Sequence, residues 1–379
     1  MRRSRRSAVD PFIVMDVMEA ARRAEAEGRH IIHMEVGQPG SPAPAGARKA
    51  LAAALEADPL GYTVALGLPE LRQGIAQLYG TWYGLELNPE RVIVTAGASG
   101  GFLLAFTAMF EAGDRVGLGL PGYPSYRHIL KALSLEAIGL PAAMENRLQP
   151  VPADVPADLD GLIVASPANP SGTMLSQAAL EALLHRAKEI GAGFISDEIY
   201  HGLHYGDRAV SALELDDDVV VVNSFSKYFS MTGWRVGWIV VPESEIRVYE
   251  RLAQNMFICA PHVSQLAATA ALGCAQECDG LRDVYAENRR LMADGLPKAG
   301  ITNFAPPDGA FYIYADVSEW TNDSRAFAAE ILAEAGVAVT PGLDFDPARG
   351  NRTLRFSYAR STADIVEGLE RIAAFTSRR

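Results

Sequence analysis

The feature that most constrains the fold is an alternation of short apolar segments with longer helical patterns between residues 92 and 241. The apolar segments are rich in β-branched residues, as buried strands are. They occupy residues 92–95, 115–118, 162–165, 193–197, 219–222 and 236–241. Helical patterns at 102–110 and 176–190 lie between them. Strands that alternate with helices are typical of a mostly parallel sheet covered on both faces. The sequence therefore predicts an α/β fold.

The segments on either side have a different character. Helices are predicted before the sheet at 11–27, 45–57 and from residue 67, with a short strand at 31–36, and after it at 243–257, 261–272 and 278–298. The last part combines strands at 310–314 and 353–357 with helices at 324–334 and 362–375, so we expect a smaller α+β unit packed with the N-terminal helix. The predicted division is an N-terminal arm and part of the small domain at 1–44, a large domain at 45–280, and a small C-terminal domain at 281–379.

Bulk properties exclude several classes of function. A chain of 379 residues is too long to fold around one small hydrophobic core, so two domains are expected. The formal net charge of −12 argues against a nucleic-acid partner, because binding to phosphates needs a basic face. The sequence has no run of about 18 apolar residues, so we expect no membrane span.

The cysteines and the N-terminus bear on location. The chain has three cysteines, an odd and small number that does not suggest a disulfide framework. They are Cys259, Cys274 and Cys278. Cys274 and Cys278 could share a helical face, but no third or fourth ligand lies near them, so we expect no metal site. A reducing, cytoplasmic compartment fits free thiols. The basic residues 1–7 predict a flexible tail, with an organellar transit peptide as the alternative.

The segment with the clearest chemistry begins at Asn223, directly after the apolar run 219–222. Lys227 lies five residues beyond that run, among small hydroxyl residues that include Ser224, and Arg235 follows eight residues later. A lysine in a cleft loses hydration, and the lower pKa makes it a nucleophile. Serines and an arginine beside it suit a phosphate. Together they suggest a Schiff base with pyridoxal phosphate. The alternative is a solvated loop with one stray cation.

Other candidates also follow predicted strands. Ligands of an open α/β sheet bind beyond the carboxyl ends of its strands, so these residues should meet at one site. The turn formed by Gly97, Ala98 and Ser99 opens a helix, where backbone N–H groups can bind a phosphate. Tyr123 could stack on a planar cofactor, and prolines on both sides of Asn169 restrict its backbone. The alternatives are a glycine turn built for packing, an aromatic packed in a loop, and an ordinary Asn–Pro turn.

Two charged residues complete the set. Asp197 ends an apolar strand, and a carboxylate in such surroundings needs a cationic partner, which a protonated pyridine nitrogen would supply. Glu198 competes for this role, but Asp197 is nearer the strand and is preferred. Arg355 lies in a strand of the smaller unit, where its guanidinium can bind a carboxylate through two parallel bonds. The alternative for Arg355 is a surface salt bridge.

At this point the sequence resembles the class I/II aminotransferases, which are fold-type I pyridoxal-phosphate enzymes similar to aspartate aminotransferase. The motifs that carry the resemblance occur in the family's order and span nearly the whole chain. They are Val36 to Pro39, Tyr62, Gly67 to Arg72, Ser166 to Gly172, Ser196 to Tyr200, Ser224 to Gly237, and Arg355 to Ala359.

The resemblance implies a role for each matching residue. Lys227 matches the Schiff-base lysine and Asp197 the partner of the pyridinium nitrogen. Tyr200 and Asn169 match the pair that binds the phenolic oxygen of the cofactor, and Tyr123 matches the stacking aromatic. Arg355 matches the arginine that binds the substrate α-carboxylate, with the Gly37 backbone and Asn169 beside it. The residues that match the phosphate site are Gly97, Ala98, Ser99, Ser224, Arg235 and, from the neighbouring subunit, Tyr62.

The implied activity is transfer of an amino group from an L-amino acid to a 2-oxo acid through internal aldimine and pyridoxamine forms, with Lys227 moving the proton. The implied assembly is a homodimer with shared active sites. Ala98 stands where relatives often have a second glycine, and its N–H can still donate. We find no candidate for the second arginine of dicarboxylate-specific relatives, which puts aspartate in doubt as the preferred donor.

Two other functions remain open from the sequence. A β-elimination lyase acting on sulfur amino acids would share Lys227 and Asp197. A non-catalytic, cofactor-sensing regulatory domain would be joined to a DNA-binding module, whereas only about ten residues precede the first predicted helix here.

Overall fold

A seven-stranded sheet forms the centre of the protein in a computed structural model that describes residues 2–379. Its strand order is β2-β8-β7-β6-β5-β3-β4. Only β8 runs antiparallel to its neighbours, which confirms the predicted mostly parallel sheet. The strands are β2 (Val92–Thr95), β3 (Arg115–Leu120), β4 (Glu136–Pro141), β5 (Gly161–Ala165), β6 (Gly193–Asp197), β7 (Val220–Ser224) and β8 (Gly237–Val240).

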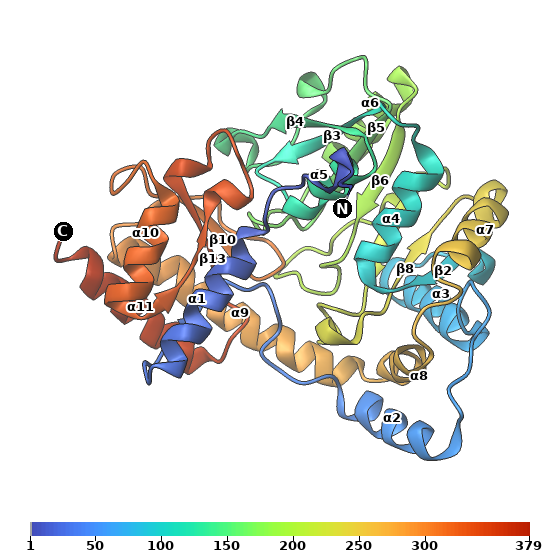
Figure 1. The fold of residues 1–379 in the computed structure, drawn as a ribbon, viewed down its shortest axis with the longest axis horizontal. Helices are drawn as coiled ribbons and strands as arrows, with labels where there is room; N and C mark the ends of the chain where they lie inside the picture. Colours follow the sequence, from blue (N-terminus) through green and yellow to red (C-terminus); the bar gives the residue numbers. More distant parts are fainter. Residues whose placement is uncertain (1) are drawn as a thin grey trace.

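Helices cover both faces of this sheet (Figure 1). Side chains alternate along a strand, so Ile163 packs into one core cluster while Leu162 and Val164 pack into another. The helices on the Ile163 face are α4 (Gly97–Met109), α5 (Pro124–Ala132) and α7 (Ile246–Met256). Those on the other face are α3 (Pro69–Tyr83), α6 (Gln177–Ile190) and α8 (His262–Ala271), with α2 (Ala45–Ala57) packed on α8. Burial on both faces explains why the inner strands β5, β6, β7 and β8 are mostly apolar.

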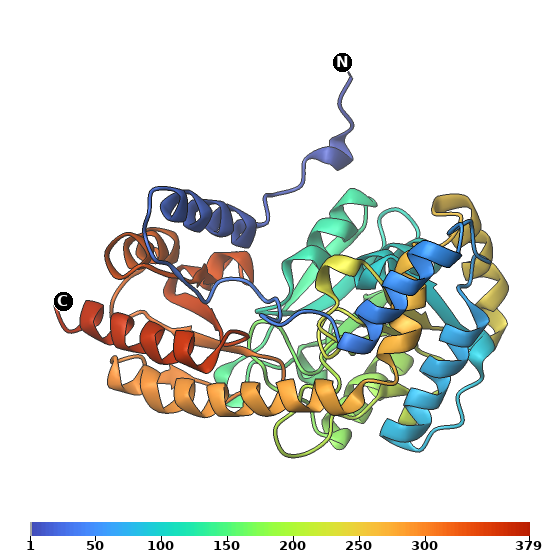
Figure 2. The same ribbon diagram turned by 90° about the horizontal axis from the view of Figure 1, so that it is seen from below.

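The second unit joins the two ends of the chain, as the sequence predicted. Its strands are β1 (Ile32–His33), β9 (Asn303–Phe304), β10 (Tyr312–Asp316), β11 (Val337–Ala338), β12 (Thr340–Pro341) and β13 (Thr353–Ser357). One sheet has the order β12-β13-β10-β9, and β1 pairs with β11 in another. Figure 2 shows α1 (Ile13–Ala26) on one side of these strands and α9 (Ala275–Lys298) and α11 (Thr362–Thr376) on the other. α10 (Ser324–Glu330) contacts β12 and β13.

The structure corrects several boundaries. The sequence analysis missed β4, an edge strand with four exposed residues and a single β-branched one, Ile138, and it missed α5, which begins at Pro124 directly after a loop. The strand predicted at 31–36 shrinks to Ile32–His33, because β11 offers only two partners. The helix predicted at 102–110 begins earlier, at Gly97, and the one at 324–334 gives way to a π-helical turn after Glu330. Within residues 2–379, none of the helices combines the length and apolarity needed to cross a bilayer.

Candidate active site

A cavity of about 190 Å³ lies at the carboxyl ends of the central strands, between the large sheet and the smaller unit. Loops that follow β2, β3, β5, β6 and β7 supply its walls, as expected for an open α/β sheet. Arg355 reaches it from β13 of the smaller unit. The predicted site residues that line it are Gly37, Ala98, Ser99, Tyr123, Asn169, Asp197, Tyr200, Lys227, Arg235 and Arg355.

Three predicted site residues do not line this cavity. Gly97 lies just behind the wall with φ of +73°, and a side chain there would collide with the guanidinium of Arg235. Ser224 donates from Oγ to the carbonyl of Val236 at 3.0 Å and lies 2.8 Å from the Oγ of Ser226, so Ser226 forms the wall instead. Tyr62 is 82% exposed, on the loop between α2 and α3.

Lys227 projects into the cavity from the loop after β7. Its Nζ donates to the carbonyl oxygen of Gly37 at 2.6 Å. The pKa of Lys227 is lowered to about 7, first by burial and then by the positive charges of Arg355 and Arg235. A substantial fraction of neutral amine is therefore present at neutral pH, which is the form that attacks a carbonyl carbon.

Asp197 faces the cavity, whereas Glu198 points away from it. Asp197 is 4% exposed and accepts hydrogen bonds from the Tyr126 hydroxyl and from the Ile199 N–H at 3.0 Å. Burial raises the pKa of Asp197 to about 6. A cation brought beside it would favour the carboxylate form. Glu198 accepts from Ser196, Ser211 and the Ala212 N–H, on the far side of the strand. The geometry therefore makes Asp197 the better candidate for a cationic ring nitrogen.

Arg355 is buried, with 2% of its surface exposed, and its guanidinium makes several contacts. Its Nη1 donates to the Asn169 side-chain oxygen at 3.0 Å, and its Nη2 donates to the Glu35 carbonyl and to Thr340 Oγ1. The guanidinium carbon lies 4.5 Å from the ring centre of Tyr312 and 4.6 Å from that of Phe345. The buried Nε has no partner among the residues described. A ligand carboxylate would meet a fixed cation that has a free donor.

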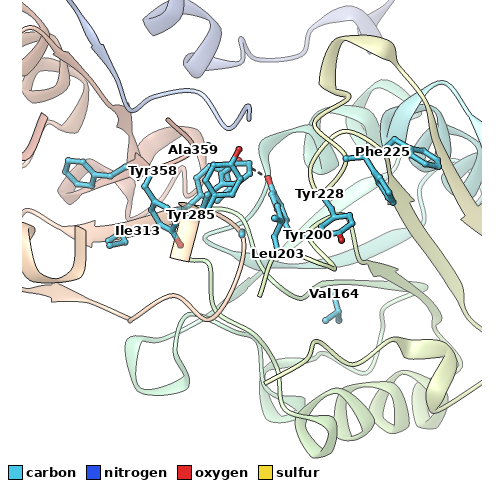
Figure 3. Packing of buried hydrophobic residues seen from close by; sticks show 14 of the residues in the cluster. Val164, Tyr200, Leu203, Phe225, Tyr228, Tyr285, Ile313, Tyr358 and Ala359 are labelled. Atoms are coloured by element: carbon cyan, nitrogen blue, oxygen red, sulfur yellow. Dashed lines mark hydrogen bonds between the residues drawn. The ribbon is translucent and has the colours of Figure 1, made fainter. Parts of the chain in front are cut away.

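Aromatic residues join the two units around the cavity. The hydroxyls of Tyr200 and Tyr312 lie 2.8 Å apart, and Figure 3 shows Tyr200 pointing toward the aromatic residues of the smaller unit. On the opposite side, Phe12 contacts Tyr123 edge-on, with ring centres 6.0 Å apart. Sequence reasoning missed Tyr126, Ser226, Tyr312 and Phe12. Ser226 belongs to the motif Ser224 to Gly237, and Tyr126 lies three residues after Tyr123, whereas no local pattern distinguishes Phe12 or Tyr312.

The donor set fits a phosphorylated aldehyde cofactor. The N-terminus of α4, Ser226 and Arg235 meet at one end and suit a phosphate. Lys227 lies within the same wall, and buried Asp197 has no cationic hydrogen-bond partner among the described residues. These residues define a site where an amine can carry a phosphorylated carbonyl compound beside an arginine that can bind a carboxylate.

Comparisons with known proteins identify the family of this chain. A family model described as aminotransferase class I and II matches residues 29–372. The valine–pyruvate aminotransferase of Mycobacterium tuberculosis is 46% identical over 98% of this chain and 97% of the relative. A solved structure of a candidate aminotransferase from Silicibacter pomeroyi is 68% identical with a TM-score of 0.96, covering 100% of both chains. Aspartate aminotransferase from Thermus thermophilus with maleate is 31% identical with a TM-score of 0.92, over 99% of this chain and 100% of that one.

The chain belongs to the class I and II aminotransferase family. Its cofactor is accordingly pyridoxal 5′-phosphate, and its reaction is transamination between an amino acid and a 2-oxo acid. The names of the relatives favour transamination over the β-elimination lyase that the sequence left open.

Proposed function

We propose that this aminotransferase prefers an apolar, monocarboxylic L-amino acid as donor, with valine among its donors and pyruvate among its acceptors. The observation that carries the proposal is the number of positively charged side chains that line the cavity. Among the described residues, the cavity is lined by three basic side chains, those of Lys227, Arg235 and Arg355. Each has a proposed task at the cofactor or at the α-carboxylate. Within the described residues of one chain, no further cation lines the cavity for the distal carboxylate of aspartate or glutamate.

The wall formed by the N-terminal segment supports the same preference. It contributes Phe12, Val14 and Met15, and Val36 and Ile129 also line the cavity. Apolar walls favour aliphatic side chains, at about 0.8 kcal/mol for each buried methylene group. A charged side chain would lose hydration against this wall without a partner. The name of the 46% identical relative, valine–pyruvate aminotransferase, supports the same donor and acceptor.

The chain's own residues suggest how the reaction proceeds. Bound pyridoxal phosphate supplies an electron sink for the electron pair of the substrate Cα–H bond. Lys227 would carry the cofactor and, once its amine is free, would take the proton from the substrate Cα as general base and deliver it to the C4′ carbon of the cofactor as general acid. Asp197 would hold the ring nitrogen and Tyr123 would stack on the ring, while Tyr200 and Asn169 would bind the phenolic oxygen. Arg355, Asn169 and the Gly37 backbone would orient the α-carboxylate.

The phosphate would bind a separate group of residues. In this proposal they are Gly97, Ala98, Ser99, Ser224, Ser226 and Arg235, with Tyr62 of the partner subunit. Ser226 joins the predicted set because it lines the cavity while Ser224 lies behind it.

A half-reaction screen tests the donor preference. The purified enzyme is mixed with each natural L-amino acid, and the absorbance change of the cofactor gives kcat/KM. We expect valine and other aliphatic donors to react at least about tenfold faster than aspartate or glutamate. An enzyme that reacts fastest with a dicarboxylic donor overturns the proposal.

A matched pair of variants sharpens that screen. Phe12→Ala removes apolar contact from the cavity wall, so kcat/KM should fall about tenfold for valine and less for alanine, which has less side chain to bury. Val9→Ala is the control, because Val9 is 42% exposed and does not line the cavity. Equal losses for both donors would show that Phe12 does not form the side-chain pocket.

We also propose a homodimer with shared active sites. Exposed apolar residues support it: Tyr62 is 82% exposed, Val64 58% and Ile258 50%. Their two loops are adjacent, since His262 Nδ1 lies 2.9 Å from the Gly61 carbonyl and Gln265 donates to Thr63. Such a patch is typical of a surface that a second copy covers.

Two further proposals concern the domain boundaries and the location of the protein in the cell. The large and small domains are kept as residues 45–280 and 281–379, with residues 1–44 as the N-terminal arm and part of the small domain. Because α9 crosses residue 280 without a break, that boundary falls inside a helix. A cytoplasmic location is supported by Cys259, Cys274 and Cys278, which are free thiols within residues 2–379.

A further inference from the structure

We propose that Asp344 is a positioning residue that fastens the N-terminal segment across the active site and thereby sets the selectivity for apolar donors. Asp344 ends a short 3-10 turn, Gly342–Asp344, and is 0% exposed. It does not line the cavity, so its effect on the substrate would be exerted through Phe12, Val14 and Met15. The selectivity part of this inference rests on the proposed donor preference.

The carboxylate of Asp344 caps α1 from a distant part of the chain. Asp344 Oδ1 accepts from the Ile13 N–H and Oδ2 from the Val14 N–H, both at 3.1 Å. The residue before the helix, Phe12, has no side chain that could cap it. A carboxylate at a helix N-terminus is also favoured by the helix dipole. The entry of the chain into α1, where Phe12 turns toward Tyr123, is therefore held by one buried side chain.

The same turn is tied to the rest of the active site. The Asp344 carbonyl accepts from Arg127 of α5. The next residue, Phe345, lies against the guanidinium of Arg355 at 4.6 Å, and its carbonyl accepts from the Gly122 N–H at 3.1 Å, beside Tyr123. One turn thus contacts the α-carboxylate arginine, the loop of the stacking aromatic and the segment that forms the apolar wall. A shift of this turn would change the spacing between the carboxylate and side-chain ends of the pocket.

Replacement of Asp344 by asparagine tests the role. Asparagine has one acceptor oxygen, so one of the two N–H groups would face an amide nitrogen that also donates. We expect kcat/KM for valine to fall about tenfold and that for alanine less than about threefold, mainly through KM. Trypsin cleavage of the cofactor-free protein after Arg22 or Arg23, in α1, should become at least about fivefold faster.

Matched controls separate positioning from general damage. Asp10→Asn removes a carboxylate of the same segment, 74% exposed and 3.6 Å from Lys131, and should match the wild type in both assays. Ile13→Pro removes one capped N–H without touching Asp344. Proline is tolerated at this first helical position, and Phe12 already has the extended backbone that must precede it. Ile13→Pro should lower kcat/KM for valine and speed trypsin cleavage, as Asp344→Asn does but to a smaller extent. Ile13→Ala, which keeps the N–H, should not have these effects.

A double-mutant cycle decides whether Asp344 acts through the segment. If it does, Phe12→Ala adds less than about twofold to the loss caused by Asp344→Asn, because the segment is already displaced. Full additivity, or proteolysis unchanged in both Asp344→Asn and Ile13→Pro, overturns the inference. If Asp344→Asn does not fold, the comparison of Ile13→Pro with Ile13→Ala decides alone. A wild-type enzyme that prefers dicarboxylic donors refutes the donor proposal, while the proteolysis result still decides whether Asp344 fastens the segment.

Discussion

Arg355 in the small sheet donates a hydrogen bond to Asn169, in the loop that follows β5 of the large sheet, with 3.0 Å between Nη1 and Oδ1. The two residues are 186 positions apart in the chain. Asn169 follows β5 and Arg355 lies in β13, so this bond crosses the boundary between the two units at the cavity. A substrate held by Arg355 would therefore have its orientation fixed by both units.

We predict that Arg355→Ala lowers kcat/KM about 30-fold or more for every amino-acid donor. Charge-assisted hydrogen bonds contribute about 1.5–3 kcal/mol, and every donor has the α-carboxylate that would be lost as a partner. Steady-state kinetics with valine, alanine and aspartate measure the effect, with Arg360→Ala outside the cavity wall as the control. A loss limited to one class of donor would show that Arg355 recognises the side chain instead.

The pKa of Lys227 can be tested in the cofactor-free protein. Its amine is predicted to react with trinitrobenzenesulfonate at a rate that rises with pH through a midpoint near 7, since only the neutral form attacks. Arg355→Gln should move the midpoint upward, because it removes a positive charge that disfavours the lysine cation. Peptide mapping identifies the labelled lysine. A midpoint near that of ordinary lysines would contradict the burial argument.

The stability of the fold should depend on His33. His33 Nδ1 lies 2.8 Å from Glu35 and Nε2 lies 3.0 Å from Glu25, so a protonated ring can donate to both carboxylates. Mainly because of Glu35, the pKa of His33 rises from 6.5 to about 9. Because the pKa is higher in the folded state, protonation of His33 stabilises the protein. This stabilisation is fully present below pH 6.5 and is lost as the pH rises through about 9.

Denaturant unfolding at pH 6.5 and 9.5 measures this effect. The free energy of unfolding of the wild type should fall by about 1–2 kcal/mol more than that of His33→Gln over that range. This figure is reduced for solvent screening because the His33 side chain is 23% exposed. The control is His185→Gln, since His185 is 74% exposed beside Glu189. Equal pH dependence in wild type and His33→Gln would rule out the contribution of His33.

Mixed dimers test whether Tyr62 acts on the partner's site. In a dimer of one Tyr62→Ala chain and one Lys227→Ala chain, a shared arrangement leaves one site with both residues intact. Random exchange of equal amounts should make about half of the dimers mixed and restore about a quarter of wild-type sites. Tyr62→Ala must first be shown to be impaired by itself. Activity that stays at the average of the parents after verified exchange excludes the shared arrangement.

The sequence by itself determined the large sheet and the edge of it where chemistry occurs. Buried parallel strands must be apolar throughout, so the runs at 162–165 and 219–222 could be recognised without partners. Residues at or just beyond the ends of such strands, including Asp197 and Lys227, had to meet at one edge of the sheet. The edge strand β4 escaped detection because, with four exposed residues, it lacks the β-branched run of the buried strands.

Only the tertiary structure decided which side chains face the cavity and what closes it. Ser226 rather than Ser224 forms the wall, because Ser224 is turned toward the Val236 carbonyl across the β7–β8 pair. Phe12 and Asp344 are more than 300 residues apart, and no local pattern links a helix start to a turn so far along the chain. Local sequence sets strands and helices through propensity and periodicity, whereas such contacts depend on how the two units pack.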